Sequence, residues 1–385
     1  RSSAATDVYK RQGGTGGHVI PAKVFYDYFK EKFNVKIISD KRGLNFIEKE
    51  NYNVNEIHIP QFKKNFSILI FPFFLIASFL KSLFFLKKEN PKLLLSTGGY
   101  MSIPHCLAAR ILNIKIFLFE PNLVIGRSNL LLLRFCKKIF AYETNLKNLP
   151  SKFLYKLKVI KPIVRKEFLK QKKTSPSDKK LKVLIIGGSQ TAKKLDTIFL
   201  KDFLRISKMI DLTIYHQTSE SNQEYLKNFY EKNSITNKVF TFEDKLSEIM
   251  SLCDFAITRA GASTLSELVS LKIPFLAIPF PFSKDDHQYF NAKFYVDKNF
   301  GWLINENEIF EDSLYKFYIE NLHNKQMLVN KVEKMSNFIS SSENFYMTEN
   351  IFRSLDEKYI VYIIFIFTIF SVLLFLSMKF IRDKR

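Results

Sequence analysis

The stretch Lys182-Val-Leu-Ile-Ile-Gly-Gly-Ser-Gln190 runs from an apolar segment directly into a glycine-rich turn. An earlier stretch, Gly-Gly-Thr-Gly-Gly-His at residues 13–18, is also glycine-rich, and the apolar run 92–96 leads to the pair Gly98-Gly99. Apolar runs that end in glycine turns are typical of strands that feed helices in parallel α/β sheets. The repetition predicts two α/β halves.

The rest of the chain follows the same alternation. Strand-like runs stand at 35–38, 114–119 and 138–141 in the first half, and at 212–215, 239–242, 255–258 and 274–279 in the second. Helical segments separate them, which predicts two doubly wound, Rossmann-like domains. We expect an N-terminal domain at 13–162, a polar, proline-punctuated linker at 163–180, a C-terminal domain at 181–340 and a connecting helix at 341–358.

Length and charge narrow the class of protein. The chain has 385 residues, enough for two domains, and a formal net charge of +22, which attracts anionic partners. Its lysines are spread out and no nucleic-acid-binding motif is present, so we expect no nucleic-acid partner. Three widely spaced cysteines form no CxxC pair, which favours a reducing environment over a zinc site or a disulfide framework.

The two ends of the chain differ in character from the rest. Residues 1–12 contain no apolar strand to feed the first glycine turn; we interpret them as a cloning or assembly scar and expect the first strand to be missing. Residues 359–378 carry no charge and are followed by basic residues. A helix of that length would span roughly 30 Å, so the pattern predicts a transmembrane helix at 359–381, with the basic globular part in the cytoplasm.

A second apolar run, 66–80, contains Pro72 and is bordered by lysines on both sides. It is short for a membrane span. One interpretation is a helix that lies on an anionic membrane surface, with its lysines at the lipid phosphates. The alternative is a helix buried in the core between two strands.

The glycine turns themselves suggest phosphate binding. Without a Cβ atom, backbone N–H groups can approach phosphate oxygens, and a helix that starts there adds partial positive charge. Neither turn has the GxGxxG or Walker pattern, so we expect neither a dinucleotide cofactor nor a P-loop. There is also no D-x-D motif, and we therefore expect no catalytic metal and no cofactor.

The stretch Arg-Ala-Gly-Ala-Ser-Thr-Leu-Ser-Glu-Leu at 259–268 combines hydroxyls with a carboxylate at the start of a predicted helix. Ser263, Thr264 and Ser266 can bind phosphate, and Glu267 can accept hydrogen bonds from ribose hydroxyls. The alternative is that these hydroxyls only cap the helix.

These residues resemble the MurG family of bacterial glycosyltransferases. The resemblance covers residues 13–338 and rests on motifs in the family's order: GGTGGH at 13–18, STGGY at 96–100, FEPN at 119–122, GGSQ at 187–190, RAGASTLSE at 259–267 and DDHQYFNA at 285–292. It implies a GT-B fold, two Rossmann-like domains with a cleft between them. It also implies a transfer of N-acetylglucosamine from UDP-N-acetylglucosamine to lipid I, which yields lipid II for peptidoglycan at the cytoplasmic face of the inner membrane.

The resemblance also implies site residues. The acceptor and donor phosphates would meet Thr15, Gly16 and Gly17, the donor sugar would meet Asn122, Gln288 and Asn291, and the diphosphate would meet Arg165. Ser189, Gln190, Ala262, Ser263, Thr264, Leu265, Ser266 and Glu267 would line the site for the donor nucleotide. Tyr100 and Glu243 are further expected substrate-binding positions.

Three departures from the family pattern affect the donor site. The family's H-E-Q-N reads Phe119-Glu-Pro-Asn122, Thr191 stands where the family has glycine, and an extra residue separates Pro162 from Arg165. The implied reaction inverts the anomeric carbon and needs a general base. His18 is the first candidate, because imidazole exchanges protons near neutral pH, and Glu120 is the second. His18 can instead be an orienting hydrogen-bonder, and Glu120 can instead have a structural or substrate-orienting role. A GT-B enzyme with another acceptor lipid and a non-catalytic, membrane-tethered UDP-sugar-binding protein remain alternatives.

Overall fold

The computed structural model describes residues 16–31, 33–39, 47, 50–56, 67–99, 102–171, 180–187, 192–340 and 360–364. They divide into two compact units. The N-terminal unit holds residues up to 161 together with 360–364, except 122–124, which belong with 162–340 in the C-terminal unit. The expected scar at 1–12 and the expected connecting helix at 341–358 lie outside the described residues.

The described part of the N-terminal unit contains a seven-stranded sheet in the order β2-β1-β13-β3-β4-β5-β6. Every neighbouring pair is parallel. The strands are β1 (Asn34–Ser39), β2 (Val54–Glu56), β3 (Leu93–Ser96), β4 (Lys115–Phe119), β5 (Lys138–Ala141), β6 (Leu157–Val159) and β13 (Ile360–Ile364). The predicted doubly wound, parallel architecture is confirmed for this half.

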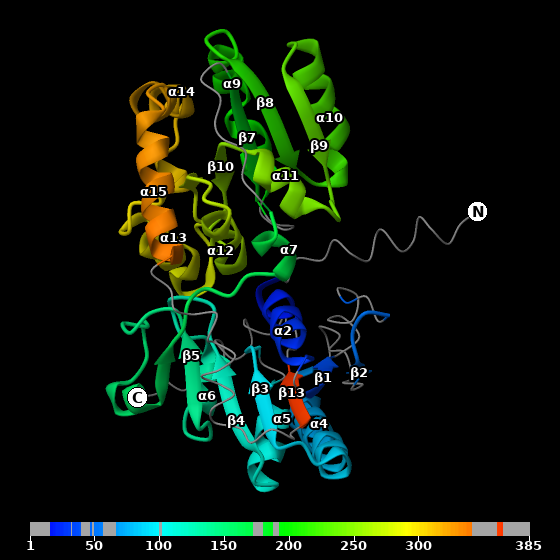
Figure 1. Ribbon diagram of the computed structural model, residues 1–385. Coiled ribbons are helices and arrows are strands. Elements are labelled where there is room, and N and C mark those ends of the chain that lie inside the picture. Colours follow the sequence, from blue (N-terminus) through cyan, green and yellow to red (C-terminus); the bar gives the residue numbers. More distant parts are fainter. Residues whose placement is uncertain are drawn as a thin grey trace, which may run out of the picture. The chain divides into compact units, whose positions relative to one another are not determined.

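The central strand of this sheet comes from the far end of the sequence. β13 pairs with β1 on one side and β3 on the other, with Tyr362 opposite Lys36 and Leu94, and it lies between them in Figure 1. The transmembrane helix predicted from residue 359 is therefore wrong for residues 360–364. A short run of Ile, Val and Tyr suits a strand buried on both faces as well as a helix, and apolarity alone does not separate the two.

None of the helices in the described part of the chain is long and apolar enough to span a membrane. Residue 359 and residues 365–381, the remainder of the predicted span, lie outside the described residues. From the sequence we expect the first strand of this sheet to be missing. β13 occupies its position in the sheet.

The helices of the N-terminal unit are α2 (Gly16–Phe29), α4 (Ser67–Glu89), α5 (Ser102–Ile111) and α6 (Arg127–Leu132), with a 3-10 turn at Ser151–Lys156. The apolar run predicted at 66–80 is the first part of α4. Its Ser78, Ser82 and Leu86 are buried, whereas Phe73 and Phe84 are 71% and 72% exposed. The helix fits neither the membrane-surface nor the core alternative fully, because one of its faces is buried and another is exposed and apolar.

The described part of the C-terminal unit contains a six-stranded sheet in the order β12-β11-β10-β7-β8-β9, again with parallel neighbours. The strands are β7 (Lys180–Ile186), β8 (Asp211–Gln217), β9 (Thr236–Phe240), β10 (Phe255–Thr258), β11 (Phe275–Ala277) and β12 (Gly301–Leu303). Numbered within the unit, this is the 3-2-1-4-5-6 order of dinucleotide-binding folds. Ligands of such sheets bind beside the carboxyl ends of the first and fourth strands, here β7 and β10.

Helices cover both faces of this sheet. Alternate residues of β7 enter two separate cores, Leu181, Val183 and Ile185 on one side and Leu184 and Ile186 on the other, as the two-residue period of a strand requires. The α-helices are α7 (Lys166–Leu169), α8 (Ala192–Ile198), α9 (Leu200–Ile206), α10 (Glu220–Lys232), α11 (Leu246–Leu252), α12 (Ala262–Ser270), α13 (His287–Val296), α14 (Ser313–Phe317) and α15 (Gln326–Ser340). Shorter helical turns lie at Lys284–Asp286, Glu306–Glu308 and Tyr318–Leu322.

Candidate functional site

His18 lies on the first turn of α2, beside the carboxyl end of β3. Its Nδ1 is 2.7 Å from the carbonyl oxygen of Thr97, and the Thr97 hydroxyl donates back to the His18 carbonyl at 3.1 Å. A carbonyl oxygen only accepts, so Nδ1 carries the hydrogen in this contact and Nε2 is left with its lone pair. The geometry thus presents the nitrogen that a general base needs.

Gly98 supports this contact through its backbone. Its φ angle is +92°, which L side chains rarely adopt, and a Cβ atom there would lie 3.1 Å from Cε1 of His18. The Gly98 N–H also donates to the Ser96 hydroxyl at 3.2 Å. Glycine is therefore needed at this position both for its conformation and for the space that His18 occupies.

Glu120 follows β4 and is 3% exposed. Its Oε2 accepts from the Gly126 N–H at 2.8 Å and from Nδ2 of Asn129 at 3.0 Å. Asn129 also donates to the Phe119 carbonyl at 3.1 Å. The carboxylate thus holds the loop between β4 and α6, which supports the structural alternative for Glu120 over the role of a base.

In the C-terminal unit, Gly261 is the N-cap residue of α12, which follows β10. No side chain makes the capping hydrogen bond. The capping alternative for Ser263 and Thr264 is therefore wrong: both lie within the first turn, and Ser266 instead donates to the Ala262 carbonyl at 2.8 Å. The first-turn N–H groups have no intrahelical partner, as at any helix start, which suits an anion.

Arg165 and Glu267 form an ion pair, with Nε of Arg165 2.8 Å from Oε1 of Glu267. The Glu267 side chain is 4% exposed, and Arg165 is 24% exposed and also lies 3.3 Å from Glu167. Burial raises the pKa of the Glu267 carboxyl above its ordinary value, and the Arg165 guanidinium opposes this rise without cancelling it. Arg165 and Glu267 thus bind each other, whereas the resemblance assigns them to the diphosphate and the ribose.

Asn291 is completely buried on α13 and contacts the segment after β4. Its Oδ1 accepts from the Leu123 N–H at 2.9 Å, and its Nδ2 donates to Oδ1 of Asn122 at 3.1 Å and to the Ala260 carbonyl at 3.2 Å. Two predicted sugar-binding residues, Asn122 and Asn291, are therefore in direct contact.

Gln288, the third predicted sugar-binding residue, lies one turn earlier on α13. Its Oε1 accepts from the Phe280 N–H at 2.9 Å. This bond joins α13 to the segment that follows β11 (Phe275–Ala277).

Two other predicted substrate-binding residues have structural contacts. Leu265 is fully buried in the core beneath α12. Glu243 accepts from Nζ of Lys238 at 2.6 Å and from the Lys245 N–H at 3.1 Å, both close in sequence. Gly16 and Gly17 open α2, whereas Thr15, Tyr100, Ser189 and Gln190 lie outside the described residues.

Sequence reasoning missed the role of Arg259, which stands directly after β10. It is 4% exposed, donates to the carbonyls of Ile278 and Pro279 and pairs with Glu306 at 2.5 Å. Glu306 also accepts from Lys194 of α8 at 2.8 Å. A buried arginine at the carboxyl edge of a sheet needs a carboxylate, but nothing in the sequence identifies Glu306 as that partner.

Family models match both halves of the chain. The N-terminal domain of glycosyltransferase family 28 matches residues 11–141, and the C-terminal domain of the same family matches residues 182–345.

Curated relatives match over most of their length. One from Pelagibacter ubique (strain HTCC1062) is 44% identical over 327 residues, which is 85% of this chain and 92% of the relative. One from Rickettsia bellii (strain RML369-C) is 31% identical over 83% of this chain and 91% of its own length. Both are named UDP-N-acetylglucosamine--N-acetylmuramyl-(pentapeptide) pyrophosphoryl-undecaprenol N-acetylglucosamine transferase.

Among solved structures, the crystal structure of Acinetobacter baumannii MurG is similar with a TM-score of 0.68 and 26% identity. The match covers 84% of this chain and 92% of that one.

Proposed function

The chain belongs to the MurG family of glycosyltransferases, and from that premise we propose that it transfers N-acetylglucosamine from UDP-N-acetylglucosamine to lipid I. The acceptor is the 4-hydroxyl of the muramoyl sugar, and the product is lipid II. The observation that carries the proposal is the identity of 44% over 85% of this chain and 92% of a relative that bears this activity in its name.

In the proposed reaction the 4-hydroxyl attacks the anomeric carbon of the donor while UDP leaves from the opposite face. His18 takes the hydroxyl proton on Nε2. The support for this role is the bond from Nδ1 to the Thr97 carbonyl, which fixes the imidazole and leaves Nε2 as the acceptor. Gly98 keeps the space that this imidazole needs.

The donor binds to the C-terminal unit in this proposal. Its diphosphate lies at the start of α12, near Ser263 and Thr264, where backbone N–H groups and the helix dipole favour negative charge. Arg165 turns from Glu267 towards the leaving diphosphate, and Glu267 accepts from ribose hydroxyls. The sugar is held from α13 by Gln288, and by Asn122, which the buried Asn291 fixes in place.

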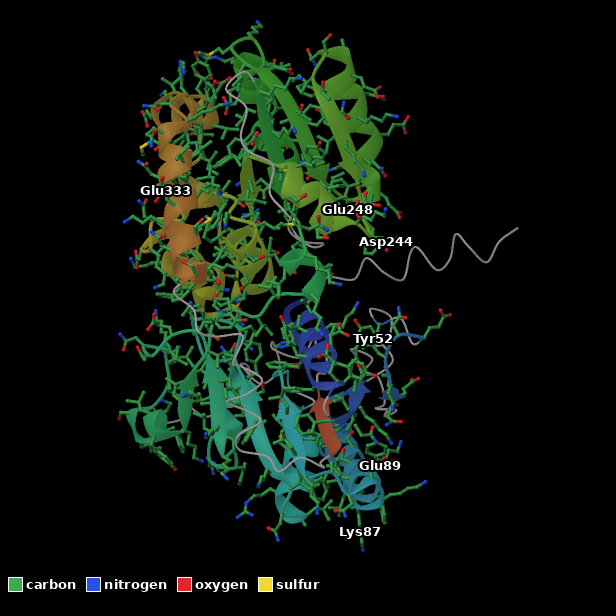
Figure 2. The ribbon with its side chains drawn as sticks, in the orientation of Figure 1. Tyr52, Lys87, Glu89, Asp244, Glu248 and Glu333 are labelled. Atoms are coloured by element: carbon green, nitrogen blue, oxygen red, sulfur yellow. The ribbon has the colours of Figure 1, made fainter. Side chains whose placement is uncertain are left out.

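We also propose that α4 docks on the cytoplasmic surface of the inner membrane, next to the lipid-linked acceptor. Phe73, Ile76, Leu80 and Phe84 are 71%, 55%, 44% and 72% exposed and recur every three or four residues, so they share one helix face. Lys81, Lys87 and Lys88 are exposed on the same helix, and Lys87 lies near its carboxyl end (Figure 2). An apolar stripe with a basic border suits an anionic leaflet.

The transfer is tested with purified protein, a lipid I analogue and UDP-N-acetylglucosamine, with the product identified by mass. UDP-glucose and UDP-galactose are the competing donors. Formation of the N-acetylglucosaminyl product at the highest kcat/KM is expected. Absence of that product, with UDP still bound, would leave a binding protein and exclude the transferase.

Membrane docking is tested by flotation with vesicles of phosphatidylglycerol and of phosphatidylcholine. The double variant Phe73→Ser, Phe84→Ser is expected to lose binding to the anionic vesicles at least tenfold. Phe310→Ser is the matched control, because Phe310 is 73% exposed but belongs to the C-terminal unit. Equal losses in both variants would contradict the assignment to α4.

A further inference from the structure

A buried polar network connects α8, β8 and α10 in the C-terminal unit. Asp196 on α8 is 1% exposed, and His216 on β8 and Tyr230 on α10 are fully buried. Nε2 of His216 is 3.3 Å from Oδ1 of Asp196, and Nδ1 of His216 is 2.9 Å from the Tyr230 hydroxyl. The three side chains form a continuous chain of hydrogen bonds across three elements.

The second oxygen of Asp196 is also used. Oδ2 accepts from the Thr218 hydroxyl at 2.7 Å and from Nδ2 of Asn222 at 2.8 Å. Burial alone would raise the pKa of Asp196, but the hydrogen bonds from His216, Thr218 and Asn222 outweigh it and hold the pKa below its usual value. A carboxylate with three donors stays ionised and only accepts, so the His216 Nε2–H donates to it.

The network lies beside the end of β7, where the donor nucleotide is proposed to bind. Gln217 is the register partner of Ile186, so His216 and Thr218 flank the carboxyl end of β7 and Gly187. α8 begins at Ala192, shortly after Gly187, and Asp196 stands at the start of its second turn. The network thus attaches the helix that follows the glycine turn to the neighbouring strand.

Packing does not require such a network. The surrounding core is apolar, with Leu195, Phe203, Leu226 and Ile214 all buried in one cluster. Apolar residues of similar volume would fill the same space without the cost of burying a charge. A buried, fully paired carboxylate instead fixes one arrangement of the elements that it joins.

We propose that Asp196 and His216 are positioning residues for the donor nucleotide, which they serve by holding α8 against the carboxyl end of β8. This inference rests on the proposed function, because it takes UDP-N-acetylglucosamine as the ligand. Neither residue touches the reacting atoms. Their loss is expected to weaken donor binding and to leave the chemical step almost unchanged.

The test compares Asp196→Asn with wild type in two measurements, the Kd for UDP by calorimetry and steady-state kinetics with a lipid I analogue. Asn keeps the size of the side chain but loses the charge and one acceptor. We expect the Kd for UDP and the KM for UDP-N-acetylglucosamine to rise about tenfold, with kcat within about twofold of wild type. Tyr230→Phe, which removes only the hydroxyl bound to His216, is the milder variant if Asp196→Asn does not fold, and should raise both constants about threefold.

Lys331→Met is the matched control. Lys331 is 4% exposed on α15, bonds Asn299 at 2.6 Å and lies in the same unit, so its loss lowers the stability of that unit without touching β7 or α8. A Kd for UDP that stayed within twofold in both network variants, or that rose equally in Lys331→Met, would overturn the inference. Failure of the proposed function has a different signature, which is wild-type protein that binds UDP but forms no lipid II analogue.

Discussion

The two sheets of the molecule share the order of six strands, to which the N-terminal sheet adds β6 at one edge, but they obtain their central strand differently. In the C-terminal unit the first position belongs to β7, which leads directly into Gly187. In the N-terminal unit the equivalent position, between β1 and β3, belongs to β13 at residues 360–364, although the helix it should precede, α2, begins at Gly16. Figure 1 shows β13 beside β1 and β3.

A strand can therefore occupy the centre of a parallel sheet if its position and direction fit, wherever it stands in the sequence. The central place needs a short apolar strand, parallel to both neighbours, with every backbone group paired. β7 lies in the sequence directly before the glycine turn of its own unit. β13 instead lies about 340 residues after the start of α2. The N-terminal sheet therefore forms only when a long loop of the chain closes to bring β13 beside β1 and β3. The central strand of the C-terminal sheet requires no such long loop.

A proline in β13 should disrupt the N-terminal sheet and leave the C-terminal sheet intact. Tyr362→Pro removes an N–H group from a strand that is paired on both sides, and it leaves a carbonyl of the sheet without its partner, at a cost of about 1–3 kcal/mol. We expect hydrogen exchange to increase in β3 of the N-terminal unit and to stay unchanged in β10 of the C-terminal unit.

Tyr362→Thr is the matched variant, because threonine keeps the N–H and suits a strand. It should retain the protection of β3. Unchanged exchange in β3 after the proline substitution would show that the N-terminal sheet is independent of β13.

Each unit also contains a glycine whose replacement by alanine should have a measurable effect. Gly301 begins β12, and a Cβ atom there would clash with the Phe275 carbonyl oxygen, which is backbone and cannot turn away. Gly301→Ala is expected to destabilise the C-terminal unit by about 2–3 kcal/mol. Urea unfolding followed by Trp302 fluorescence measures this loss, and a shift below about 0.5 kcal/mol would argue against the close approach of β11 and β12.

Gly98→Ala is expected to cost less stability and more activity. Its φ of +92° penalises alanine by about 1 kcal/mol, and the new Cβ would press on His18, which is a side chain and can shift. Turnover should fall roughly tenfold through the displaced imidazole. Gly261→Ala serves as the comparison for stability, because the nearest atom would be Thr264 Oγ1 at 3.7 Å, an ordinary contact. Equal losses of stability in the two variants would contradict the strain at Gly98.

The smallest expected effect concerns the dependence of stability on pH. Because the pKa of Glu267 is raised in the folded state, the folded protein binds more protons than the unfolded chain just above the ordinary pKa of 4.5. This group's contribution to the free energy of unfolding is therefore greatest at low pH and declines as the pH rises through the folded pKa. Glu267→Gln should flatten that decline, as measured by urea unfolding between pH 4 and pH 8. A steeper decline in the variant would show that the pKa of Glu267 is lowered.

Much of the fold could be predicted from the sequence, because the apolar runs before Gly98 and Gly187 carry the signal of buried parallel strands. The family could also be predicted, since the motifs at 96–100, 187–190 and 259–267 stand in the family's order. The role of residues 360–364 could not, because Ile, Val and Tyr in a short run suit a membrane helix as well as a buried strand. The pairs of Arg165 with Glu267 and of Asn291 with Asn122 also could not be predicted, since they join distant positions that only the folded chain brings together.

We propose that the N-terminal unit supplies the base and the C-terminal unit binds the nucleotide. This division of roles is tested most directly by measuring the Kd for UDP and the kcat in His18→Ala and Ser263→Asp. Aspartate in the first turn of α12 is compatible with the helix dipole but repels a diphosphate. Ser263→Asn is its uncharged control.

We predict that His18→Ala lowers kcat by about 10²-fold with the Kd for UDP within twofold, while Ser263→Asp raises the Kd for UDP at least tenfold. A loss of kcat below tenfold in His18→Ala, or a Kd for UDP that rises in His18→Ala and not in Ser263→Asp, would contradict this division of roles.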